Sequence, residues 1–203
     1  MSTPGRRRNT GRKGDDRELA ILDTAEALLE RDGFDRMTVE RIAQGAGITR
    51  GALYFYFGSK QEVLTALVAR TMTSVASAAD LAATTADDDV SGTVERSLLS
   101  TESSWREHGR VMQAAVELGP SIPEIGDLWK GTVGTYVDAM TEVLEGGGVA
   151  RDGGPSDARH LATALCWMTE RSYYWSYVET QTEHLHDITL TCRQLWLSVL
   201  ATR

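Results

Sequence analysis

The sequence predicts an all-α protein, in which an N-terminal three-helix helix-turn-helix domain is followed by a larger helical domain. Apolar residues recur every three or four positions through most of the 203 residues, as on the buried face of a helix. Clusters of glycine and proline interrupt this periodicity between the helical segments. A hydrophobic content of 41% is enough for an ordinary core, which excludes a disordered or fibrous chain.

Residues 1–14 mix glycine, serine, threonine, proline and arginine, with almost nothing apolar. Such a segment cannot offset the entropy lost on ordering, so we expect a disordered basic tail there. Apolar periodicity begins after Asp15 and stops at Gly33, which indicates the first helix of a small domain at 15–60.

The charges are distributed unevenly along the chain. The formal net charge is -8, yet residues 1–70 hold 12 Lys and Arg against 10 Asp and Glu, whereas residues 71–203 hold nine against 19. This asymmetry suggests an N-terminal part that approaches phosphates and a C-terminal part held away from them.

A helix-turn-helix pattern lies between Thr38 and Lys60. Thr38 and Thr49 are suitable N-caps for two short helices, and Gly47 between them tolerates the positive φ that the turn requires. The N-terminal part of the second helix, which begins at Arg50, is the part that meets base edges in such domains. Arginine can bond guanine in a bidentate manner or hold a phosphate. We therefore expect double-stranded DNA as a partner.

A long helix should follow directly. Ser59 and Glu62 have the spacing of a capping box, and the apolar period continues to about Ala83. Lys60 in the first turn opposes the helix dipole, a conflict that a nearby DNA phosphate would remove. The alternative is that Lys60 simply faces water.

Residues 61–203 are expected to form the larger domain, which binds a ligand and dimerises. The acidic run at 87–89 has no spaced partner, so we interpret 84–92 as a solvated loop and not as a metal site. Ser156 is the expected N-cap of the penultimate helix. The apolar period predicts helices near 94–108, 111–117, 125–144, 156–177 and from 182 or 183 to about 200.

Aromatic side chains gather in this larger domain, which holds all five Trp and four of the six Tyr. Large rings are hard to pack without gaps, and pockets in helical proteins are commonly lined by rings with a few polar groups. This favours a cavity for a small apolar or aromatic effector, although ordinary core packing explains the rings as well. The last two helices are apolar on more than one face, which predicts a homodimer that pairs them with the same helices of a second copy.

Several short motifs carry a resemblance to a known family. The steps Ile42-Ala43, Ala46-Gly47, Gly51-Ala52-Leu53-Tyr54, Tyr56-Phe57 and Ser59-Lys60 resemble the DNA-binding region of the TetR family of bacterial transcriptional regulators. Stretches at 14–30, 54–57, 161–165 and 168–171 are similar to the EthR-like subgroup of that family.

The resemblance implies a ligand-responsive repressor that binds a near-palindromic operator as a dimer and is released by a small apolar effector. Many members have His where this chain has Tyr56, which changes the geometry of a phosphate contact there. The operator contacts implied by the resemblance are Thr38, Thr49, Arg50, Gly51, Tyr54, Tyr56 and Lys60.

The EthR-like subgroup further implies a long, mostly apolar ligand channel. Cys166 and Thr169 stand where that subgroup has two asparagines, so a ligand carbonyl loses hydrogen-bond anchoring at both positions and the ligand chemistry is not transferable. The lining residues implied by the resemblance are Val94, Trp129, Val133, Tyr136, Cys166, Thr169, Tyr174 and Trp196.

Other classes of protein fit less well. The histidines are scattered, and His184 and His186, two apart on a helix, point in different directions and cannot share a metal well. Two cysteines in apolar helical segments indicate buried, reduced thiols. We therefore expect no enzyme, no metal and no cofactor. A helical carrier of small molecules or lipids without DNA binding is the alternative, but it leaves residues 38–60 without a purpose.

No apolar run reaches the roughly 18 to 20 residues needed to span a bilayer. The basic N-terminus has no apolar segment behind it of the kind that a secretory signal needs. We therefore expect a cytoplasmic protein without a membrane partner.

Overall fold

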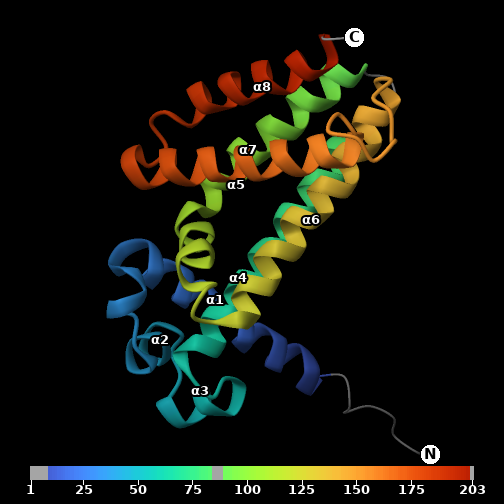
Figure 1. The fold of residues 1–203 in the computed structure, drawn as a ribbon. Helices are drawn as coiled ribbons and strands as arrows, with labels where there is room; N and C mark the ends of the chain where they lie inside the picture. Colours follow the sequence, from blue (N-terminus) through green and yellow to red (C-terminus); the bar gives the residue numbers. More distant parts are fainter. Residues whose placement is uncertain (1–8, 84–88, 202–203) are drawn as a thin grey trace, which may run out of the picture. The chain divides into compact units, whose positions relative to one another are not determined.

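The computed structural model describes the backbone of residues 9–83 and 89–201, with the side chains of 14–78 and 89–200. These residues form eight helices and no strand, which confirms the predicted all-α fold (Figure 1). The chain divides into two compact units, Met1–Ala69 and Arg70–Arg203. The division lies after Ala69 and not after residue 60 as expected, because the first turns of the fourth helix pack within the N-terminal unit.

The N-terminal unit contains α1 (Asn9–Arg36), α2 (Val39–Gly45), α3 (Arg50–Tyr56) and the beginning of α4 (Lys60–Ala83). α2 packs against both α1 and α3. The buried side chains of this unit come from all four helices, but Leu19, which the apolar period placed on the buried face of the first helix, is exposed. The buried side chains include Ile21, Leu22, Ala25, Leu28, Ile42, Ala43, Leu53, Val63, Leu64 and Leu67.

The first helix starts earlier than expected. α1 begins at Asn9, so residues 9–14, which we assigned to a disordered tail, are helical here. Once a packed helix exists, each further residue adds a hydrogen bond at little cost, which explains the extension. Residues 1–8 of the expected tail lie outside the described residues. Gly33 interrupts the regular helix with φ 74°, in the left-handed region that favours glycine, which confirms the predicted stop.

The C-terminal unit contains the rest of α4 together with α5 (Val90–Leu118), α6 (Pro123–Gly146), α7 (Ala158–Thr180) and α8 (Leu185–Ala201). α5 packs against the three helices that follow it, and α7 packs against both α6 and α8 (Figure 1). The Tyr136 hydroxyl of α6 lies 3.5 Å from the Val75 carbonyl of α4. The unit is therefore a bundle with α5 at its centre.

Two expected boundaries around α5 were wrong. The segments 94–108 and 111–117 form one helix, α5, with a kink at His108 (φ −125°, ψ 19°) and not a break. The kink lies where α5 approaches α7 most closely, since a Cβ added at Gly109 would come within 2.1 Å of the Tyr177 ring. Of the predicted loop at 84–92, residues 84–88 lie outside the described residues, and 90–92 are helical because Asp89 caps α5 by accepting from the Gly92 N–H at 2.9 Å.

The cap of α7 is Asp157 and not Ser156. One carboxylate oxygen of Asp157 accepts from the Arg159 N–H at 2.8 Å, and the other accepts from the Gly153 N–H at 2.8 Å. A carboxylate can serve both sides of the helix start in this way, whereas a serine hydroxyl is limited to one side. These backbone hydrogen bonds hold the pKa of Asp157 below its ordinary value, with burial opposing them.

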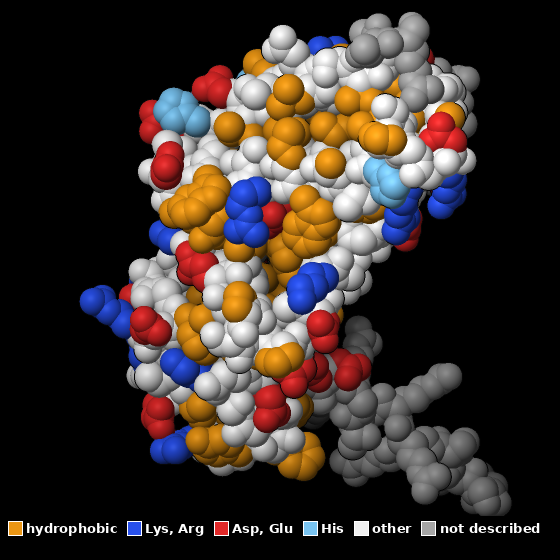
Figure 2. Space-filling model, viewed as in Figure 1, with side chains coloured by type: hydrophobic (Ala, Val, Ile, Leu, Met, Phe, Trp, Pro, Cys, Tyr) orange, Lys and Arg blue, Asp and Glu red, His pale blue; other side chains and the backbone are white. Residues whose placement is uncertain are grey.

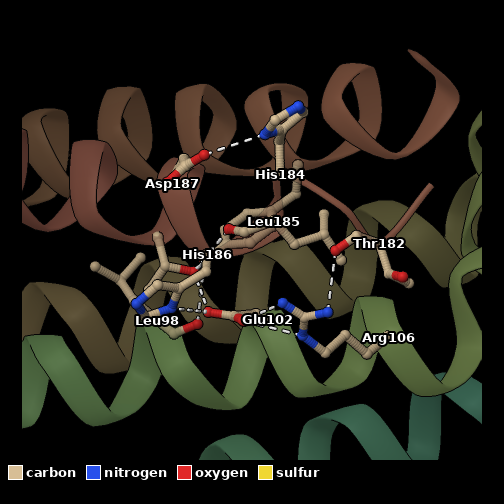
Figure 3. Close-up of polar contacts among 10 residues, drawn as sticks. Leu98, Glu102, Arg106, Thr182, His184, Leu185, His186 and Asp187 are labelled. Atoms are coloured by element: carbon tan, nitrogen blue, oxygen red, sulfur yellow. Dashed lines mark hydrogen bonds and ion pairs between the residues drawn. The ribbon is translucent and has the colours of Figure 1, made fainter. Parts of the chain in front are cut away.

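A buried polar network joins α5 to α8 (Figure 3). The Glu102 carboxylate accepts from the Thr189 hydroxyl at 2.6 Å, from the Arg106 guanidinium at 2.7 and 3.0 Å, and from His186 Nδ1 at 3.1 Å. The Tyr173 hydroxyl of α7 lies 2.6 Å from the Thr189 hydroxyl. Burial alone would raise the pKa of Glu102, but these hydrogen bonds outweigh burial and lower it.

Both cysteines, Cys166 and Cys192, are buried free thiols, as expected. None of the helices that the structure describes is long and apolar enough to cross a membrane.

Candidate DNA-reading helix and ligand cavity

The turn between α2 and α3 has the geometry that the sequence predicted. The Thr38 hydroxyl accepts from the Arg41 N–H at 3.3 Å, and the Thr49 hydroxyl accepts from the Ala52 N–H at 3.1 Å, so both threonines are N-caps. Gly47 between the helices has φ 65°. Leu53 is fully buried and fixes α3 on the domain core. α3 thus keeps its remaining side chains outward.

Arg50 is the most strongly engaged side chain of this outward face. One guanidinium nitrogen lies 2.7 Å from the Glu40 carboxylate of α2, and another donates to the Tyr54 hydroxyl at 3.1 Å. The hydrogen bond to Tyr54, followed by the charge of Glu40, raises the pKa of Arg50. Arg50 and Glu40 are well exposed, and solvent screening leaves exposed ion pairs with little net stabilisation. A DNA phosphate or guanine could therefore replace these partners at small cost.

The other expected DNA contacts differ in their surroundings. Gly51 is exposed at the start of α3, while Tyr56 is half-buried with its ring edge-to-face on Phe55 at 5.5 Å. Lys60 does not simply face water, and in the absence of DNA its ammonium group contacts Phe34 in place of a phosphate. Its Nζ donates to the Phe34 carbonyl at 3.2 Å and lies 4.2 Å from the centre of the Phe34 ring.

Phe55 is a surface residue that sequence reasoning missed. Its ring is 85% exposed and lies on α3 next to the outward-facing Tyr54. The family motif included Tyr54, Tyr56 and Phe57 but gave no role to Phe55. The signal was the helical period, because Phe55 lies two positions after the buried Leu53 and so on the opposite face.

The C-terminal unit encloses an apolar cavity between five helices. Its volume, counted for the centre of a water-sized sphere, is about 80 Å³, whereas one water needs roughly 10–15 Å³ by that measure. Met72 and Val75 of α4 contribute to the wall, as do residues of α5, α6, α7 and α8. The other lining residues are Val94, Ser97, Leu98, Thr101, Ser104, Trp105, Met112, Trp129, Thr132, Val133, Tyr136, Met140, Cys166, Thr169, Glu170 and Trp196.

The structure brings seven of the eight expected lining residues to this cavity and leaves out Tyr174. That side chain is buried, but its hydroxyl donates to Glu117 of α5 at 3.4 Å, and its ring packs edge-to-face on Trp175 at 5.1 Å. Tyr174 lies one helical turn after the lining residue Glu170. At this position its ring lies beside the C-terminal end of α5 and outside the cavity.

The two residues that replace the subgroup's asparagines behave differently from one another. The Thr169 hydroxyl accepts from the Trp196 indole at 3.0 Å, a buried hydrogen bond between α7 and α8. Burial raises the pKa of the Cys166 thiol to about 12, so this cysteine stays a neutral, apolar group in the wall. Neither side chain therefore offers a ligand the hydrogen bonds that an asparagine amide would.

Glu170 is the charged residue among the lining residues that the sequence did not single out. Its carboxylate oxygens are buried, and neither has a hydrogen-bond donor among the described residues. The indole N–H of Trp129, also in the wall, makes no hydrogen bond of good geometry in that part of the chain, although it lies near the Glu170 carboxylate. The signal in the sequence was its spacing of four from Cys166 on the cavity face of α7.

The histidines take up structural partners. His184 pairs with Asp187 at 3.1 Å, and His186 pairs with Glu102 (Figure 3). Across the residues that the structure describes, no group of three or more His, Cys, Asp and Glu side chains could hold a metal ion.

The two units match two family models. Residues 21–67 match the bacterial regulatory proteins of the tetR family, and residues 94–201 match the C-terminal domain of the transcriptional regulator EthR. The second match spans more than half of the chain. The chain belongs to the TetR family of bacterial regulators. As a TetR-family member it is a ligand-responsive, DNA-binding transcriptional regulator and not an enzyme, as predicted from the sequence.

Similar proteins place this TetR-family chain near EthR. It is 32% identical over 200 residues to the transcriptional regulator EthR of Mycolicibacterium smegmatis, covering 97% of this chain and 91% of that protein. It is 34% identical over 189 residues to EthR of Mycobacterium tuberculosis, covering 89% and 84%. The resemblance to the EthR-like subgroup is thereby confirmed.

Solved structures agree on the fold of this TetR-family chain. The fatty acid degradation regulator FadR of Bacillus halodurans superposes with a TM-score of 0.73 at 20% identity, covering 89% of this chain and 94% of that one. A TetR-like transcriptional regulator of Rhodococcus sp. RHA1 superposes with a TM-score of 0.71 at 20% identity, covering 92% and 97%.

Proposed function

We propose that this regulator is a cytoplasmic repressor, which binds a near-palindromic operator as a homodimer and is released when a small apolar effector enters the cavity. The observation that carries the proposal is that a single helix, α4, links the helix-turn-helix to the cavity. This helix opens directly after the helix-turn-helix, and its residues Met72 and Val75 form part of the cavity wall. A ligand that displaces these side chains acts on the same helix that begins beside the reading head.

DNA recognition is assigned to the outward face around α3. Arg50 supplies a bidentate donor for guanine or a charge for phosphate, and the Tyr54 hydroxyl supplies a further donor. The exposed Phe55 ring adds an apolar surface that suits a thymine methyl group. Thr38, Thr49, Gly51, Tyr56 and Lys60 complete the proposed operator contacts.

The dimer is assigned to the outward faces of α7 and α8. These faces carry the large apolar side chains Trp167, Trp175, Leu190 and Leu195, which are 38–53% exposed. Hydrophobic side chains gather on the surface over these helices (Figure 2). Contiguous exposed apolar surface of this kind marks an interaction site. Pairing with the same helices of a second copy would give a closed twofold dimer with two reading heads.

Release by an effector follows from the size of the cavity. Drug-sized ligands occupy pockets of roughly 300–1,000 Å³, much more than the about 80 Å³ present here, so a ligand must push the walls apart. The wider state then differs in affinity for the operator, and the change cannot exceed the ligand's own preference for that state. FadR of Bacillus subtilis, which has this fold at 19% identity and a TM-score of 0.72, was solved in complex with stearoyl-CoA. A protein of this architecture thus can hold a ligand with a long apolar chain.

The test is footprinting of the purified protein on the DNA that flanks its own coding region. The expected result is a protected site with two related halves, which is lost with Arg50→Ala and weakened with Tyr54→Phe. The variant Arg31→Ala, which removes an exposed arginine of α1 outside the reading face, should leave protection intact. Unchanged protection with Arg50→Ala and Tyr54→Phe would refute the assigned reading head.

A further inference from the structure

An acidic group in the cavity wall lacks the partners that a buried acid normally has. The Glu170 side chain is 7% exposed, and both carboxylate oxygens are without a hydrogen-bond donor among the described residues. Buried polar groups are hydrogen-bonded in the great majority of cases, so an exception needs a reason. The nearest cation, the Arg171 guanidinium, lies 3.4 Å from Oε2 but is half exposed and outside hydrogen-bond geometry.

The other polar groups of the wall show that this deficit is specific. Thr169 accepts from Trp196, and the hydroxyls of Ser104 and Thr132 donate to backbone carbonyls of their own helices at 2.9 and 3.0 Å. Glu170 and the Trp129 indole are the wall groups whose polar atoms make no hydrogen bond of good geometry within the described part of the chain, and the indole lies near enough to favour the charged form of Glu170. Burial raises the pKa of Glu170, and the charge of Arg171 and the Trp129 indole offset the effect of burial only in part.

Aromatic rings surround the same space. The rings of Trp105 and Trp129 line the cavity and pack edge-to-face at 6.3 Å. Indole faces attract cations, and the attraction grows when the site is closed to water. A carboxylate beside indole rings in an apolar cavity is therefore suited to a cation that is carried on an apolar body.

We propose that the effector is an apolar amine, whose protonated nitrogen binds the Glu170 carboxylate while its aromatic or alkyl body fills the space between Trp105, Trp129 and Val133. This inference rests on the proposed effector cavity and names the ligand class that it takes. A carboxylic acid of the same shape is disfavoured, because its charge would meet that of Glu170. A neutral alcohol is intermediate, since it can donate one hydrogen bond but brings no charge.

The test compares three probes of one shape by calorimetry at neutral pH: 4-phenylbutylamine, 4-phenyl-1-butanol and 4-phenylbutyrate. The wild-type protein should bind the amine about tenfold or more tightly than the alcohol, which is the usual gain from a hydrogen bond to a charged partner, and should bind the acid least. Glu170→Gln should reduce the preference for the amine to below about threefold and should still bind the alcohol, because the amide oxygen of glutamine can accept from its hydroxyl. Glu179→Gln, an exposed acid on the same helix, should keep the full preference.

The outcomes separate this inference from the proposed function. Equal affinity for amine and alcohol in the wild type, or an amine preference that survives Glu170→Gln, overturns the amine while leaving the cavity as an effector site. Loss of alcohol binding with Val133→Trp, which fills the cavity, supports the cavity itself. If none of the three probes binds the wild type, both proposals fail. Retained alcohol binding by Glu170→Gln shows that this variant is folded, and the comparison of probes in the wild type needs no variant.

Discussion

The Thr189 hydroxyl is predicted to stabilise the C-terminal unit by about 2 kcal/mol. Thr189→Val keeps the shape of the side chain but removes the buried donor that lies 2.6 Å from the Glu102 carboxylate. A hydrogen bond to a charged group contributes roughly 1.5–3 kcal/mol, and the bonds from Arg106 and His186 that remain on Glu102 keep the expected loss below the upper limit. The Tyr173 hydroxyl retains the Leu98 carbonyl as an acceptor at 3.2 Å, so it adds little to the cost.

The assay is urea unfolding of both proteins at equal concentration, because the proposed dimer would make stability depend on concentration. Thr191→Val is the matched control. Thr191 is an exposed residue of the same helix, and its hydroxyl donates to the Asp187 carbonyl of its own helix. It should change the free energy of unfolding by less than about 0.5 kcal/mol. Equal effects of the two substitutions would refute the assigned role of the network.

The same comparison depends on pH. The pKa of Glu102 is lowered in the folded protein, so its carboxylate stabilises the fold above the unfolded-state pKa, and this contribution is lost as the pH falls through the folded-state pKa. The stability difference between wild type and Thr189→Val should therefore shrink in acid. A difference that grows as the pH falls would contradict the lowered pKa.

Two further changes test the reading head and its turn. Arg50→Ala should weaken operator binding about tenfold or more in fluorescence anisotropy, as expected for loss of a base or phosphate contact, and Arg31→Ala, its matched control, should stay within about twofold. Gly47→Ala should lower the free energy of unfolding by about 1–2 kcal/mol in urea titrations, because alanine is strained at φ 65°. Gly131→Ala, at an exposed helical position with open space around it, should instead raise it by about 0.5–1 kcal/mol, and a similar effect at both glycines would contradict the assigned backbone strain.

The features that could be predicted from the sequence are those that neighbouring residues determine. Thr38, Thr49 and Gly47 define the caps and the turn of the helix-turn-helix within a few positions, so local rules were sufficient there. The start of α7 was one residue off because Asp157, adjacent to Ser156, can accept from both sides of the cap. Local rules thus located the reading head and the helices, with errors at their ends.

The features that could not be predicted depend on contacts between distant segments. The kink at His108 follows from the approach of the Tyr177 ring to Gly109, far along the chain. That the buried Glu170 carboxylate makes no hydrogen bond of good geometry is visible only in the structure, where α6 and α7 form the same wall. The displacement of Tyr174 from the cavity likewise depends on Glu117 of another helix. Periodicity identifies which face is buried, but it does not say what that face meets.

The central claim, that the cavity controls DNA binding, is tested most directly by one linkage measurement. The affinity for the footprinted operator duplex is measured with and without a saturating compound that binds the wild type but not Val133→Trp. The account predicts that the compound weakens operator binding of the wild type by about 5- to 150-fold, the usual range of allosteric coupling, and leaves Val133→Trp unaffected. An operator affinity of the wild type that stays the same with the cavity saturated would contradict it.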